Sequence, residues 1–250
     1  IKLFIEYGML SDEKFCERAM KFTLLKNTDG KYFSIDDYRK AIEPAQTDKD
    51  KKLIFLYATD SEKQYFFIDA AKNQGYDVLL MDCELDSHFV NLLESKLENV
   101  RFARVDSDSV DKLIQKEDEV KLELSEDDKK SLDEMFKSVL PQGNEYMVEA
   151  RNLGETAVPV LITQNEFMRR YREMSAMGGG MNFYGSIPES YNIIVNMQNP
   201  LVAKIWNDRA VEGDNDLLRQ VVDLALLSNG MLKGKDLSDF VARSEKLLGK

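Results

Sequence analysis

The sequence predicts a mixed α/β protein made of two units: a small unit with a parallel sheet and a following α+β unit. Continuous apolar runs at 52–59, 77–82 and 100–106 have the composition of buried strands. Helical patterns separate these runs, and strands that alternate with helices are typical of a parallel sheet covered on both faces, a three-layer α/β/α arrangement. The later part has three further apolar runs and a leucine-rich end, which favours a three-stranded sheet with helices and a C-terminal helix pair.

The composition argues against several classes of function. Among the 250 residues, 34 Lys and Arg residues face 45 Asp and Glu residues, a formal net charge of −11. Nucleic acid is therefore not expected as a partner, because phosphate binding needs clustered cations. No membrane partner is expected either, since no run of about 18 apolar residues exists. The two cysteines form no CxxC pair, which predicts a cytoplasmic protein without a disulfide framework. With His88 as the single histidine, no metal site or catalytic triad built on imidazoles is expected.

The first 43 residues are predicted to be helical, and Pro44 is expected to end this block. Apolar side chains recur there at helical spacing, and Ser34 with Asp37 has the spacing of a capping box. The strand at 52–59 leads into a helix that Ser61 and Gln64 would cap in the same way. The strand at 77–82, a helix around 85–97 and the strand at 100–106 complete the unit. Because the chain opens inside a helical pattern without Met, we expect it to be part of a longer protein.

An acidic stretch separates the two units. Between 106 and 128, ten acidic residues face three lysines, which predicts a solvated linker, part of which could be ordered. We therefore expect domains at 1–108 and 126–250, joined by a linker at 109–125. In the second domain Ser125 and Asp128 are predicted to cap a helix, and strands are predicted at 146–153, 157–164 and 190–197. The short connection between the first two strands favours an antiparallel hairpin at 146–164.

One helix of the second domain has an apolar face next to a glycine-rich segment. Thr163 and Glu166 have capping-box spacing, and four apolar side chains then share one face: Phe167, Tyr171, Met174 and Met177. An ordinary core helix would explain this pattern. The three consecutive glycines at 178–180 predict a mobile stretch, however, and mobile Met-rich surfaces suit the binding of varied apolar partners. Both interpretations stay open.

The last two predicted helices carry more apolar surface than they can bury on each other. Pairing with a second copy in a four-helix bundle would bury the excess, and docking onto the sheet of the same chain is the alternative. The residues of the predicted dimer interface are Leu217, Leu218, Val221, Val222, Leu224, Ala225, Leu227, Phe240, Val241, Leu247 and Leu248.

A different class of function would use the carboxyl ends of the first strands. Asp60, Asp82 and Cys83 follow predicted strands, where α/β enzymes and phospho-receiver domains place reactive groups. Local capping explains both aspartates as well, and Cys83 has no basic neighbour in sequence that would favour its thiolate. An enzyme or phospho-receiver is thus the alternative function, and a purely structural dimeric scaffold is another.

Five segments follow one another along the chain: KLIFLYAT, DVLLMDCELDSHFVNLL, YMVEARNL, AVPVLITQNEFMRRYREM and YNIIVNMQNPLV. Their order, together with the leucine-rich terminal pair, resembles the ninety-kilodalton heat-shock chaperone family in its bacterial HtpG branch. The resemblance covers essentially the whole chain. It implies that 1–108 corresponds to the later part of a middle domain. It also implies that 126–250 is a dimerisation domain, whose last two helices form a four-helix bundle with those of a second chain.

The resemblance also implies which partners the chain has. Partly folded client proteins would contact the amphipathic helix at Phe167, Met168, Tyr171, Met174 and Met177. A second client patch of the family corresponds to His88 and Asn91, where His88 replaces the aromatic residue of bacterial relatives. ATP and Mg²⁺ would bind a domain that precedes this chain, so we expect no cofactor and no enzyme activity in these 250 residues. A homodimer is implied, and another chaperone system is a further implied partner.

Overall fold

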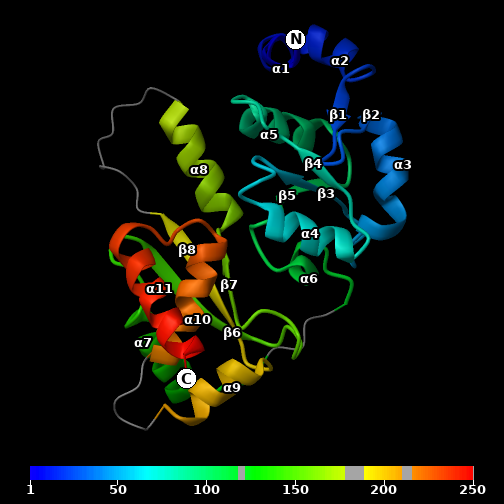
Figure 1. The fold of residues 1–250 in the computed structure, drawn as a ribbon. Helices are drawn as coiled ribbons and strands as arrows, with labels where there is room; N and C mark the ends of the chain where they lie inside the picture. Colours follow the sequence, from blue (N-terminus) through cyan, green and yellow to red (C-terminus); the bar gives the residue numbers. More distant parts are fainter. Residues whose placement is uncertain (118–121, 178–188, 210–215, 250) are drawn as a thin grey trace. The chain divides into compact units, whose positions relative to one another are not determined.

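Figure 1 shows the computed structural model, which describes the chain except for residues 118–121, 178–188, 210–215 and 250. The described residues form a mixed helical and sheet protein, in agreement with the predicted α/β class, and they divide into two compact units. The first unit contains the described residues of Ile1–Asp118 and Glu166–Ser186, and the second those of Glu119–Asn165 and Ile187–Lys250. The stretch at 178–188 that was predicted to be mobile lies outside the described residues.

A parallel sheet with the order β4-β3-β5 forms the centre of the first unit. Its strands are β3 (Leu53–Ala58), β4 (Val78–Leu80) and β5 (Val100–Arg104), and the helices α4 (Tyr65–Asn73) and α5 (Asp86–Lys96) connect them. All six residues of β3 are buried, as expected for the central strand of a parallel sheet. Phe55 of β3 packs edge-on against Tyr38 and at a tilt against Phe102 of β5, with ring centroids 5.0 and 4.9 Å apart. The alternation of strand and helix was thus predicted correctly.

The prediction of helix throughout 1–43 is wrong, because a hairpin interrupts it. The elements are α1 (Lys2–Ser11), α2 (Glu13–Ala19), β1 (Leu24–Lys26), β2 (Tyr32–Ser34) and α3 (Ile35–Gln46). The side chain of Asn27 accepts hydrogen bonds from the backbone of Asp29 and Lys31, and Gly30 has a φ of 79°, a conformation that favours glycine. The prediction that Pro44 ends the helical block is also wrong, since Pro44 lies inside α3. It lies in the last turn of the helix, so the backbone N–H that proline lacks is missing only there.

Two of the predicted helix caps form as expected. The Ser34 hydroxyl accepts from the backbone N–H of Asp37, and that of Ser125 accepts from Asp128, at 3.2 and 3.1 Å. The cap predicted at Ser61 does not form, because α4 begins only at Tyr65.

The predicted linker is partly folded. It contains the short helix α6 (Val110–Leu113), and the side chains of Leu113 and Ile114 are buried in the first unit. The acidic composition of 109–125 predicted a solvated linker, part of which could be ordered, but it did not indicate that these two apolar residues are buried.

The second unit contains a mixed sheet with the order β6-β8-β7. Its elements are α7 (Glu126–Lys137), β6 (Glu145–Arg151), β7 (Val160–Thr163), β8 (Ser190–Asn196), α9 (Pro200–Asn207), α10 (Asp216–Ser228) and α11 (Gly234–Leu248). The predicted hairpin at 146–164 is wrong. β6 runs parallel to β8 and β7 runs antiparallel to it, so β8 separates the two strands. The central position of β8 agrees with its apolar side chains, because Ile193 and Val195 are both fully buried.

Candidate functional site

The helix α8 (Glu166–Met177) is the candidate functional element, and it groups with the first unit. The sequence had assigned it to the second domain. The capping box predicted at its start does not form: the buried hydroxyl of Thr163 has no hydrogen-bond partner among the described residues, and the Glu166 side chain points to other partners. Its partners are Tyr57 of β3 and, within α8 itself, Arg169 and Arg170. The helix α8 packs against α5.

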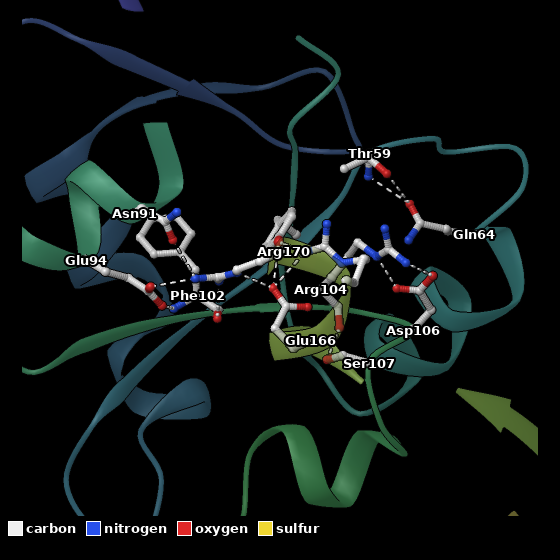
Figure 2. A network of polar contacts seen from close by, with 12 residues as sticks. Thr59, Gln64, Asn91, Glu94, Phe102, Arg104, Asp106, Ser107, Glu166 and Arg170 are labelled. Carbon is white, nitrogen blue, oxygen red and sulfur yellow. Dashed lines mark hydrogen bonds and ion pairs between the residues drawn. The ribbon is translucent and has the colours of Figure 1, made fainter. Parts of the chain in front are cut away.

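Arg170 joins α8 to the first unit through a set of hydrogen bonds that we call the Arg170 clamp (Figure 2). Its guanidinium donates to the Asn91 side chain at 3.0 Å, to the Glu94 carboxylate at 2.7 Å and to the backbone carbonyl of Phe102 at 3.0 Å. Within α8 it also donates to Glu166 at 2.6 Å. Only 14% of the Arg170 side chain is exposed, so these charge-assisted bonds are partly shielded from water.

A second group of contacts fixes the start of α8 on β3. The Tyr57 hydroxyl donates to Glu166 at 2.8 Å, and Arg169 donates to the same carboxylate oxygen at 2.8 Å. Burial raises the pKa of Tyr57, which therefore stays a neutral donor. Burial also acts to raise the pKa of Glu166, but the charges of Arg169 and Arg170 outweigh it and the pKa is lowered. Glu166 is thus held as a carboxylate between two arginines.

The apolar side chains of α8 stay accessible while the clamp holds the helix. Phe167 is 73% exposed and Tyr171 54%, and their rings stack at 6.5 Å between centroids. Met168 is also exposed. Met174 and Met177 belong to α8, but their side chains lie outside the described residues. The interpretation of α8 as an ordinary core helix therefore fails for Phe167 and Tyr171.

The second predicted patch lies on α5, next to α8. His88 and Asn91 are both half-buried and one helical turn apart, so they share a face of α5. Asn91 accepts the hydrogen bond from Arg170. The Arg170 clamp therefore links Asn91, a residue of the second predicted client patch, to α8, the helix that carries the first predicted client patch.

The residues of the predicted dimer interface differ in burial. Five of them are buried in the core of the second unit, where a second chain would not reach them: Leu218, Val221, Val222, Ala225 and Phe240. Leu217 is partly buried at the edge of the same core. The other five are exposed on α10 and α11, between 41% and 88%: Leu224, Leu227, Val241, Leu247 and Leu248.

A comparison with known proteins identifies the family. The profile of the Hsp90 protein family matches residues 3–250. The chain belongs to the Hsp90 family, in its HtpG branch. It is 37% identical to the chaperone protein HtpG of Porphyromonas gingivalis and 38% identical to that of Bacteroides fragilis, over 99% of this chain and 46% of each relative. The HtpG of Bacteroides thetaiotaomicron is 36% identical over the same shares. The chain therefore spans a little under half the length of these Hsp90 relatives.

The residues of the alternative function have local structural partners in this Hsp90 chain. Asp60 accepts from the backbone of Glu62 and Lys63, and the hydrogen bonds from Lys63 lower its pKa. Asp82 is half-exposed and faces Lys2 at 3.4 Å. Burial raises the pKa of the Cys83 thiol, which disfavours a nucleophilic thiolate. No described helix is both long and apolar enough to cross a membrane.

Sequence reasoning missed the polar residues that hold α8. The sequence does contain an indication of the contact within the helix, since Glu166 and Arg170 are four positions apart and oppositely charged pairs at this spacing stabilise helices. This indication did not reveal the partners Asn91 and Glu94, which are 79 and 76 positions away.

Proposed function

We propose that this chain is the client-contacting and homodimerising part of a cytoplasmic, HtpG-like chaperone that assists protein folding. In this proposal residues 1–108 are the later part of a middle domain, 109–125 connect it to the next, and 126–250 form the C-terminal dimerisation domain. ATP and Mg²⁺ would be bound by an N-terminal domain outside these residues, so this part has no enzyme activity and no nucleotide cofactor of its own. A partnership with another chaperone system belongs to the same proposal.

The observation that carries the client-contacting role is the stacked, exposed pair of Phe167 and Tyr171 on a helix that is fixed by its polar side. Aromatic side chains bury about 150–250 Å² each in a contact, and apolar burial is worth about 25 cal/mol per Å². A client that covers both rings therefore gains several kcal/mol before the cost of ordering it, on the order of the weak binding that varied clients require. Exposed Met168 adds a side chain that adapts to different shapes.

The client-contacting role is tested with the double variant Phe167→Ser/Tyr171→Ser. Binding of a fluorescently labelled, reduced and carboxymethylated lactalbumin is measured by anisotropy. We expect about a tenfold or greater loss of affinity, which corresponds to ~1.4 kcal/mol. Phe22→Ser is the matched control, because Phe22 is 57% exposed in the same unit and outside the proposed surface. Equal affinity of the double variant and the unchanged protein would favour the purely structural scaffold.

The homodimerising role rests on the exposed apolar side chains of α10 and α11. The two helices are in contact with each other, and exposed apolar side chains that gather on neighbouring helices are typical of an interaction surface. A two-fold pairing of the two helices would bury these side chains in a four-helix bundle. Dimerisation would also turn the closure of the upstream domains into an intramolecular event, with a higher effective concentration.

The dimer is tested by sedimentation of this chain. We expect a dimer that becomes a monomer with Leu224→Asp/Val241→Asp, since both side chains are 46% exposed and their replacement leaves the core intact. Leu201→Asp, a similarly exposed leucine on α9, should leave the dimer unchanged. A monomeric starting protein would contradict the proposed role.

A further inference from the structure

A cluster of three potential metal ligands lies where α1 packs against the start of α5. Glu6 of α1, Cys83 and Asp86 of α5 each offer one ligand atom, and these atoms lie within 4.8 Å of one another. Tetrahedral ligands around Zn²⁺ are about 3.6 Å apart, as follows from Zn–S and Zn–O distances near 2.3 and 2.1 Å. Side-chain shifts of about 1 Å would therefore bring all three atoms to zinc distance.

Two carboxylate oxygens of this cluster are buried without a partner outside it. The side chains of Glu6 and Asp86 are each only 3% exposed. Glu6 has side-chain hydrogen bonds with Cys83 and Asp86 inside the cluster, and beyond the cluster Glu6 Oε2 and Asp86 Oδ1 have no hydrogen-bond partner among the described residues. Buried acceptors of this kind are uncommon, and a bound ion is one of the standard reasons for them.

The cluster already attracts a cation. The ammonium group of Lys2 lies 3.0 Å from Asp86 and 3.7 Å from Glu6, so one positive charge faces two buried carboxylates. It contacts Asp86 Oδ2 and Glu6 Oε1, which are not the oxygens without partners. A second cation would balance the remaining charge.

We propose that Glu6, Cys83 and Asp86 form a zinc site that fixes α1 on α5. A thiolate together with two carboxylates favours Zn²⁺ over Mg²⁺ or Ca²⁺, because sulfur is a soft ligand. Three protein ligands leave the fourth position to water, and half-buried Cys83 gives the ion a route from solvent. The Cys83 thiol loses its proton to solvent as the Zn–S bond forms.

A proton is the competing occupant of the cluster. Burial and the neighbouring Asp86 raise the pKa of Glu6 to about 7, so a protonated Glu6 would relieve the charge without any metal. Only the zinc site predicts that the protein binds one equivalent of metal through the sulfur of Cys83; a protonated Glu6 does not.

The test uses this chain with Co²⁺ as a spectroscopic probe and Zn²⁺ as its competitor. We expect one equivalent of Co²⁺ to give a sulfur-to-cobalt charge-transfer band in the near ultraviolet, which Zn²⁺ abolishes. Cys83→Ser should remove the band, and Glu6→Gln should weaken metal affinity at least about tenfold, since even groups that only orient a ligand are worth that much. Asp82→Asn is the matched control, because Asp82 also faces Lys2 but contributes no ligand.

Lys2→Met is expected to change Co²⁺ affinity in the opposite direction to the ligand variants. Removal of the competing ammonium should strengthen Co²⁺ binding several-fold, whereas loss of a ligand weakens it. Circular dichroism identifies any variant that fails to fold. Absence of the band in the unchanged protein, or its persistence in Cys83→Ser, would overturn the proposal.

Discussion

Replacement of Arg170 by Met tests the clamp that holds α8 on the first unit. Met keeps most of the apolar stem but removes the bonds to Asn91, Glu94 and the backbone of Phe102. Removing one partner of a buried ion pair costs about 3–5 kcal/mol, because the other charge stays behind. Glu94 and Glu166 are 26% and 16% exposed, so water compensates in part and we expect the low end, about 3 kcal/mol.

The assay is amide hydrogen exchange of the α8 backbone. A released helix of 12 residues is marginal in water, so α8 would lose its protection when it leaves the first unit. A cost of about 3 kcal/mol corresponds to exchange that is faster by roughly 100-fold in Arg170→Met. The exchange of β3 should change far less.

The matched control is Lys137→Met, which breaks a helix ion pair with Asp133 of similar length, 2.8 Å, on an exposed surface. Such surface pairs contribute about 0–1 kcal/mol, so this variant should leave α8 unchanged. If α8 exchanges equally fast in Arg170→Met and in the unchanged protein, the clamp does not hold the helix and the reasoning fails.

Three other predictions concern the effect of low pH on α8, the loss of the buried Asn196 amide and the replacement of Gly30 in the β1–β2 turn. Because the pKa of Glu166 is lowered in the folded state, its stabilising effect is complete above its ordinary value of 4.5 and is lost as the pH falls further. The protection of α8, measured as its exchange rate relative to the intrinsic rate of an unfolded chain at the same pH, should therefore fall in acid, and Glu166→Gln should remove most of this dependence. Asn196→Ala should cost about 3 kcal/mol in urea unfolding, since its fully buried amide bonds Leu153 and Gly154; a loss under 1 kcal/mol would contradict this. Gly30→Ala should lower stability by about 1–2 kcal/mol at unchanged m-value, because its φ is 79°, and an unchanged urea midpoint would speak against strain.

The parallel sheet could be predicted because its strands have mainly apolar sequences. Burial on both faces requires continuous apolar residues, and β3 meets that requirement at every position. The β1–β2 hairpin was missed because each strand has only three residues, too few to show a period of two. Asp29-Gly30 was the available turn signal.

Other features depend on partners that a local pattern does not specify. The apolar stripes of α10 and α11 predicted an excess of apolar surface, but helical spacing does not tell which side faces the sheet of the same chain. Leu218 and Leu224 illustrate this: the first is 2% exposed and the second 46%. The pairing of β6 with β8 likewise depends on the register of distant strands, which the sequence of either strand alone leaves open.

The central position of β8 determines the order in which the second unit can assemble during synthesis. Glu145 of β6 is aligned with Ser190 of β8, 45 positions later, and β7 also has β8 as its partner. At roughly 5–20 residues per second, a ribosome needs about 2–9 s to deliver the strand that joins the other two. During that interval the backbone groups of β6 and β7 are unpaired, a condition that promotes aggregation. Edge-to-edge association of the second unit with other chains is therefore most favoured before β8 has been made.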